Sequence, residues 1–119
     1  MQNDRSKFKG RVYRFALDII GFVERLPKGQ VSRIISDQLL RSATSIGANV
    51  VEAQGASSRK DYTNFFTYAL KSANETKFWL SLLQDSGKAE GKATDKLLKE
   101  VTELANILAS SILTLKSKK

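Results

Sequence analysis

Hydrophobic side chains recur every three to four residues along most of this chain, a spacing that places them on one face of an α-helix. Short polar stretches interrupt the pattern three times, and no segment sustains the alternation typical of a β-strand. The pattern therefore predicts an all-α protein, with helices at about 8–26, from 32 or 36 to 54, at 59–84 and at 93–115. Because the connections are short, we expect one domain over residues 1–119, an up-down-up-down antiparallel four-helix bundle.

Local signals indicate three of the helix ends. Pro27 stops the first helix because proline lacks an amide hydrogen and restricts the residue before it. Ser32 and Ser36 are both suitable N-caps for the second helix, and the sequence leaves this choice open. Ser58, followed three residues later by Asp61, resembles a capping box at the start of the third helix.

The second helix carries two parallel rows of side chains, one apolar and the other polar but small. The apolar row is Leu39, Ala43, Ile46, Val50 and Ala53, and the polar row is Gln38, Ser42, Ser45, Asn49 and Glu52. Small side chains let another helix approach closely, and buried polar groups need hydrogen-bond partners. We therefore interpret this helix as the central packing element, enclosed from two sides. Gly47 in its middle predicts either a bend or a close neighbour.

The polar row is open to three interpretations. The favoured one is a hydrogen-bonded seam between helices or subunits, in which Arg41 and the polar row satisfy one another and face Ser72 and Glu75 of the third helix. The second gives Glu52 and Glu75 an acid–base or metal-binding role. It has little support, because di-metal bundles use Glu-x-x-His pairs and the chain has no histidine. The third is a ligand or peptide site of undefined chemistry.

Composition excludes several classes of function. The chain has neither cysteine nor histidine, which rules out disulfides, thiolate metal sites and the Ser-His and Cys-His catalytic pairs. We therefore expect no enzyme, no metal and no cofactor. No apolar run is long enough to span a membrane, and the N-terminus lacks the apolar core of a secretion signal. The expected location is the cytoplasm.

Positive charge is concentrated at the two ends of the chain. Of the net charge of +8, residues 1–14 contribute +4 and residues 116–119 contribute +3. An up-down-up-down bundle brings both termini and the loop between the second and third helices to the same end. The candidate phosphate contacts there are Arg11, Arg14, Arg59, Lys60, Lys116, Lys118 and Lys119. They form either a surface for RNA or DNA without sequence preference, or solvated, flexible ends over about 1–7 and 116–119.

Aromatic side chains crowd the third helix. Phe65, Phe66, Tyr68, Phe78 and Trp79 are expected mainly in the core, with part of this surface facing a neighbouring subunit. The helix is apolar over more than half of its circumference, so in a lone subunit it would leave an apolar patch exposed to water. We therefore expect a neighbouring subunit to cover part of it. Apart from Tyr13, no aromatic residue is expected beside the basic ones, so the sequence does not predict base stacking.

Two segments carry a family pattern. Its members in the second helix are Gln38, Leu39, Arg41, Ser42, Ala43, Ser45, Ile46, Ala48, Asn49, Glu52 and Gly55, and in the third Ala69, Ser72 and Glu75. The chain thereby resembles the small four-helix-bundle proteins first noticed as reading frames inside intervening sequences of bacterial large-subunit ribosomal RNA genes. The accessory variability protein of diversity-generating retroelements is similar to them. Gly47 stands where that family usually has proline, and Ala53 and Ala56 stand where it often has Gly and Arg.

The resemblance implies a bundle that assembles as a ring-like homopentamer and, in the retroelement relatives, an affinity for nucleic acid. For most members of this family no biochemical role is established. We therefore expect a non-enzymatic oligomeric binding module that engages RNA or DNA, or a nucleic-acid enzyme, through its basic end. The alternative is a structural homo-oligomer that recruits a protein partner and has no nucleic-acid role.

Overall fold

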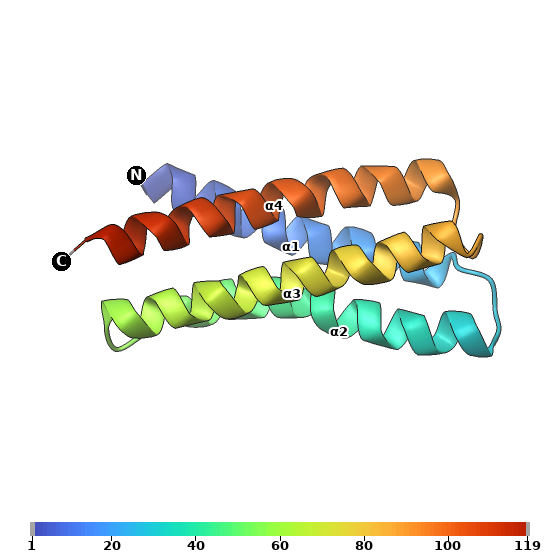
Figure 1. Ribbon diagram of the computed structural model, residues 1–119, viewed down its shortest axis with the longest axis horizontal. Helices are drawn as coiled ribbons and strands as arrows, with labels where there is room; N and C mark the ends of the chain where they lie inside the picture. The colour runs from blue at the N-terminus through green and yellow to red at the C-terminus, as the bar shows by residue number, and fades with distance from the viewer. Residues whose placement is uncertain (1, 119) are drawn as a thin grey trace.

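Four helices run alternately up and down along a molecule of 50 × 22 × 20 Å (Figure 1). They are α1 (Gln2–Glu24), α2 (Gln30–Ala53), α3 (Arg59–Asp85) and α4 (Gly91–Ser117). This computed structural model describes the backbone of residues 2–118 and the side chains of residues 7–118, so Lys119 lies outside the described residues. The all-α, up-down-up-down fold predicted from the sequence is confirmed.

Three helices begin earlier than predicted, α4 by only two residues. α1 starts at Gln2 rather than near residue 8, because no glycine or proline interrupts the polar residues that precede its first apolar position. Neither candidate serine caps α2, since Ser32 and Ser36 are both buried within the helix. Gly29 occupies the N-cap position instead, with a φ of 154° that glycine tolerates and with no side-chain hydrogen bond.

The start of α3 follows the predicted signal, and a glycine turn follows its end. Ser58 Oγ accepts a hydrogen bond from the backbone N–H of Asp61 at 3.0 Å, as an N-cap does. The Asp61 carboxylate accepts from the backbone N–H of Ser57, one residue earlier than in a capping box. At the other end, Gly87 adopts a left-handed φ of 77° and the chain turns towards α4.

The apolar row of α2 fills the middle of the bundle, as predicted. Leu39, Ala43 and Ile46 are completely buried. The rows that meet them from the other helices are Val12, Phe15, Ile19 and Phe22, then Phe66, Ala69, Ala73, Leu80 and Leu83, and finally Leu97, Val101, Leu104, Leu108 and Ile112. α2 runs uninterrupted through Gly47, where a Cβ would lie 3.8 Å from Val12 Cγ2. This would be an ordinary van der Waals contact, so Gly47 lies beside α1 but the approach of that helix does not require a glycine.

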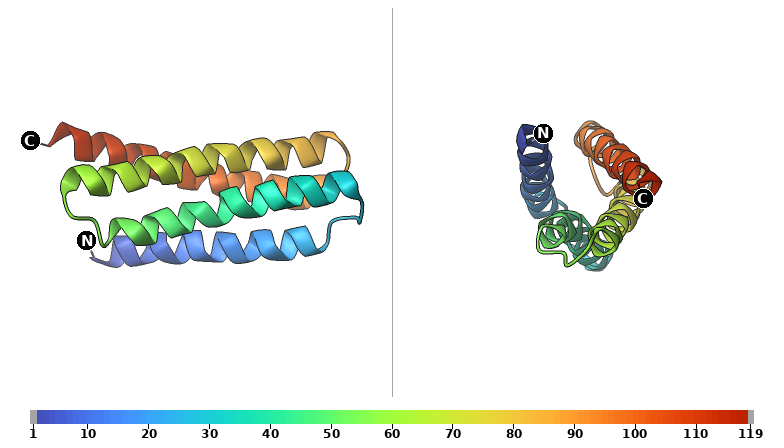
Figure 2. Two further views of the ribbon diagram at one scale, coloured as in Figure 1. Left: turned by 90° about the horizontal axis from the view of Figure 1, so that it is seen from below. Right: turned by 90° about the vertical axis from the view of Figure 1, so that its left-hand side faces the viewer.

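The bundle is open along one side. α2 packs against α1 and α3, and α3 packs against α4, whereas the contact between α1 and α4 is the smallest of the four. Seen end-on in Figure 2, α1 and α4 stand apart from each other. A groove of about 870 Å³ runs between them over the buried rings of Phe15 and Phe22. Within the described part of the chain, no helix has the length and apolar character needed to cross a bilayer.

Candidate nucleic-acid interface

Both chain ends and the α2–α3 turn lie at the same end of the bundle, on the left in Figure 1. This brings together basic residues from α1, from the start of α3 and from the end of α4 with the residue after it. We define the basic end as Lys9, Arg59, Lys60, Lys116 and Lys118. The last four are exposed. Lys9 Nζ donates to Gln54 Oε1 at 3.2 Å and so links α1 to the end of α2. Antiparallel helix order alone therefore concentrates positive charge from distant parts of the sequence.

Arg11, a candidate phosphate contact, has two carboxylate partners instead. Its guanidinium donates to both Glu100 carboxylate oxygens, at 2.7 and 3.0 Å, and to Glu103 at 3.0 Å. The hydrogen bonds that Arg11 donates to Glu100 hold the pKa of Arg11 above its ordinary value. Arg11 therefore ties α1 to α4. Local sequence patterns do not indicate this contact, because the partners lie 89 and 92 positions away. Arg14 is exposed and lines the α1–α4 groove.

A cavity of about 560 Å³ opens at the basic end. Its lining residues come from the α2–α3 turn and from the ends of three helices: Ala53, Gln54, Ala56, Ser58, Arg59, Tyr62 and Leu115. The Tyr62 ring stacks on Phe66, with the ring centroids 4.9 Å apart and the planes 24° from parallel. Sequence periodicity does not single out Tyr62, because it does not show that the bundle ends beside this ring.

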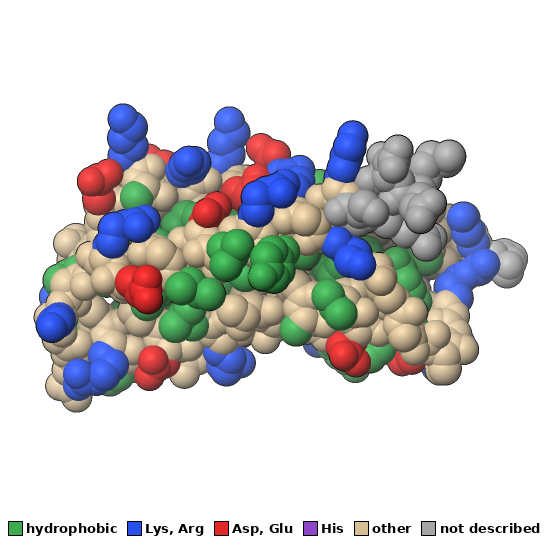
Figure 3. Space-filling model, turned by 180° about the vertical axis from the view of Figure 1, so that it is seen from behind, with side chains coloured by type: hydrophobic (Ala, Val, Ile, Leu, Met, Phe, Trp, Pro, Cys, Tyr) green, Lys and Arg blue, Asp and Glu red, His purple; other side chains and the backbone are tan. Residues whose placement is uncertain are grey.

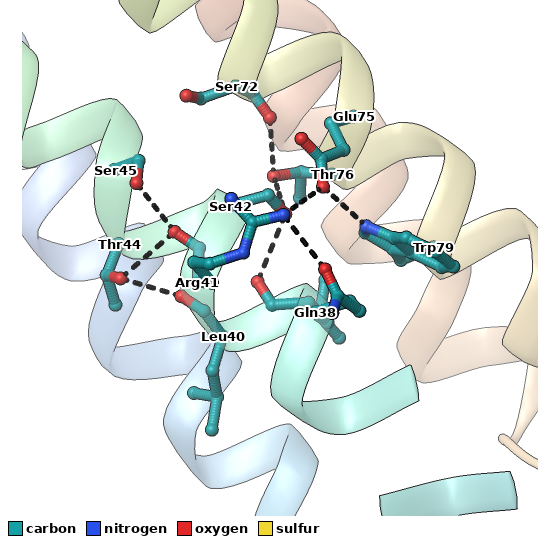
Figure 4. Close-up of polar contacts among 11 residues, drawn as sticks. Gln38, Leu40, Arg41, Ser42, Thr44, Ser45, Ser72, Glu75, Thr76 and Trp79 are labelled. Carbon is teal, nitrogen blue, oxygen red and sulfur yellow. Dashed lines mark hydrogen bonds and ion pairs between the residues drawn. The ribbon is translucent and has the colours of Figure 1, made fainter. Parts of the chain in front are cut away.

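The polar row of α2 divides into two halves, and the first half meets α3 (Figure 4). Ser42 and Thr76 are both buried, and their hydroxyl oxygens lie 2.9 Å apart. Thr76 Oγ1 also lies 2.8 Å from the carbonyl oxygen of Ser72, to which it donates. The small side chains let α2 and α3 approach closely while every buried hydroxyl keeps a partner.

An ion pair flanks this contact on the more exposed side. Arg41 Nη2 donates to Gln38 Oε1 at 2.8 Å and to Glu75 Oε2 at 2.9 Å. Trp79 Nε1 donates to the same Glu75 oxygen at 3.0 Å. The structure thus brings Gln38, Arg41, Ser42, Ser72 and Glu75 together between α2 and α3. Thr76 and Trp79 complete the group, although the sequence suggested no polar role for either.

The second half of the row does not join this network. Ser45 Oγ and Asn49 Nδ2 each donate to a carbonyl oxygen of their own helix, at 2.7 and 2.8 Å. Glu52 is exposed. The expectation that Asn49 and Glu52 satisfy Arg41 and Gln38 is therefore wrong within one subunit. The physical reason is that short polar side chains reach the carbonyl one turn back more easily than a neighbouring helix.

The two carboxylates weighed as an acid–base or metal pair do not share a site. Glu75 is engaged by Arg41, while Glu52 lies three helical turns from Arg41, roughly 16 Å along α2. Among the residues whose side chains the structure describes, no group of three or more potential metal ligands occurs. Glu75 thus serves helix packing and Glu52 contributes surface charge.

The chain is similar in sequence and in structure to known proteins. The family model of the 23S rRNA-intervening sequence protein matches residues 6–110. A crystal structure of a protein of unknown function from the S23 ribosomal protein family of Bacteroides thetaiotaomicron is similar over 91% of this chain and 96% of that chain, with 37% sequence identity and a TM-score of 0.85. No curated protein sequence matches the chain.

Proposed function

The chain belongs to the 23S rRNA-intervening sequence protein family, and from this premise we propose that it is a non-enzymatic, oligomeric, cytoplasmic module that binds RNA or DNA through its basic end. The observation that carries the proposal is the convergence of Lys9, Arg59, Lys60, Lys116 and Lys118 at one end of the bundle, whereas residues 15–115 as a whole carry a net charge of only +1. Cations of this kind attract phosphates whatever the base sequence, so binding without sequence preference follows.

Salt dependence tests this proposal directly. If Arg59, Lys60, Lys116 and Lys118 each neutralise one phosphate, the logarithm of the association constant for duplex DNA falls against the logarithm of salt concentration with a slope near −3.6. Fluorescence anisotropy of a labelled duplex between 50 and 200 mM salt measures the slope. A flat response, or no binding at 50 mM salt, contradicts the proposal.

We also propose that the chain assembles with copies of itself, as a ring of five by the family resemblance. Apolar side chains remain exposed on two separate faces of the subunit. One face carries Tyr13, Leu17 and Ile20 on α1, and the other carries Val31 and Ile34 on α2 with Phe78 and Leu82 on α3. Figure 3 shows hydrophobic side chains gathered in the middle of one long side of the subunit. In a head-to-tail ring, each subunit contacts its two neighbours through two different faces. Each of these two apolar faces would be shielded from water by one neighbour.

Asn49→Leu tests whether the second half of the polar row lies in such a contact. Asn49 is half-buried and bonds only to its own helix in the single subunit, so we expect the subunit to keep its helicity. In the assembly, a leucine there costs about 1–3 kcal/mol at each interface through overpacking and lost hydrogen bonds. Light scattering after gel filtration should show a lower mass.

Asn106→Leu, at an exposed position on α4, is the matched control and should leave the mass unchanged. An unaltered mass and melting temperature for Asn49→Leu would place the row outside any interface. The same two exposed apolar faces also favour the alternative function, a scaffold that recruits a protein partner. Variants that remove charge from the basic end distinguish this function from nucleic-acid binding.

A further inference from the structure

We propose that the cavity at the basic end receives an unpaired base of single-stranded RNA or DNA, with Tyr62 as the surface on which the base stacks. This inference rests on the nucleic-acid function proposed above and adds a substrate class to it. The cavity volume of about 560 Å³ lies within the range of small-molecule sites. Arg59 lines the cavity, and Lys60 and Lys116 each directly follow a lining residue in the sequence, so a strand held by its backbone passes near the opening.

The Tyr62 ring is prepared for stacking by its own packing. Phe66 holds the ring on one side at a centroid distance of 4.9 Å, and Phe66 in turn lies 6.5 Å from Phe8 of α1. Tyr62 is only half-buried and lines the cavity, so part of the ring stays accessible. An aromatic ring that is already ordered loses little conformational freedom when a base stacks on it.

The polar groups around the ring suit any base. Gln54 contributes an amide and Ser58 a hydroxyl, and both groups donate as well as accept hydrogen bonds. Arg59 adds a guanidinium to the lining, next to Lys60 on the first turn of α3. Across the cavity, Leu115 directly precedes Lys116 on α4. The base thus meets an aromatic surface while the flanking phosphates meet cations from two helices.

A preference for single-stranded over duplex nucleic acid follows from this arrangement. In a duplex the bases are paired and stacked, and turning one out costs a few kcal/mol, whereas a single strand offers its bases freely. Both forms offer phosphates to the basic end, but only the single strand reaches Tyr62. We therefore expect tighter binding of a 12-nucleotide oligo(dT) than of a 12-base-pair duplex at the same salt concentration.

The experiment compares Tyr62→Leu with Tyr68→Leu against these two probes. Loss of one stacked base should weaken oligo(dT) binding by about 5- to 150-fold and leave duplex binding within about twofold. Tyr68 lies on the same helix, is exposed, and does not line the cavity, so Tyr68→Leu should change neither affinity. Tyr62→Phe keeps the ring and should retain the wild-type preference.

A second measurement does not depend on any variant folding. An oligo(dT) with 2-aminopurine at its centre should lose fluorescence when it binds the wild-type protein, because stacking on an aromatic ring quenches that base. Equal losses for both probes in Tyr62→Leu, or no quenching with the wild type, overturn the inference and leave the proposed function standing. Failure of the wild type to bind either probe overturns both.

Discussion

Replacing Lys60, Lys116 and Lys118 with glutamine is expected to weaken duplex binding by about three orders of magnitude at 50 mM salt. The three side chains are exposed at the basic end and supply three of the four proposed phosphate contacts. Each contact removed takes about 0.9 from the salt slope, so the slope should change from about −3.6 to about −0.9. Anisotropy titrations at several salt concentrations measure both quantities.

The control removes the same charge elsewhere on the subunit. Lys92, Lys96 and Lys99 are exposed on the first half of α4, away from the basic end, and their replacement by glutamine should leave the salt slope near its wild-type value. Equal weakening in both triple variants would mean that net charge, and not its placement, drives binding. A variant at the basic end that still recruits its partner would favour the scaffold function.

Leu104→Ala is expected to destabilise the folded protein by about 2–5 kcal/mol. Leu104 is completely buried in the row of α4 that meets the other helices, and alanine leaves a cavity that the surrounding helices fill only in part. Because a whole domain is stable by only about 5–15 kcal/mol, this is a large fraction of the total. Urea unfolding followed by circular dichroism, at one fixed protein concentration, gives the free energy of unfolding.

Leu113→Ala on the same helix is the matched control. Leu113 is 71% exposed, so its replacement should change the free energy of unfolding by less than about 0.5 kcal/mol. If both variants lost several kcal/mol, Leu113 would be covered in the assembled protein, and the apolar surface of α4 would belong to a subunit contact. If Leu104→Ala lost almost nothing, the packing described here would be wrong.

Helical periodicity explains why the fold could be predicted from sequence alone. The apolar rows through Leu39 and Leu104 specify which face of each helix is buried, and short connections allow only antiparallel neighbours. The same topology explains why the basic end could be expected, since helix order alone brings Arg59 and Lys116 to one end. The start of α2 was missed because Gly29, without a side-chain cap, gives a weaker signal than the two serines that follow.

The sequence by itself determined four amphipathic helices, their alternating direction, the small polar row of α2 and the placement of basic residues at one end. Only the tertiary structure decided that Arg11 binds Glu100, that the polar row meets α3 through Ser42 but leaves Asn49 to its own helix, and that Tyr62 borders a cavity. The reason is physical. Periodicity is a local property of the chain, whereas ion pairs and cavities depend on how each helix is rotated and displaced against neighbours that are distant in sequence.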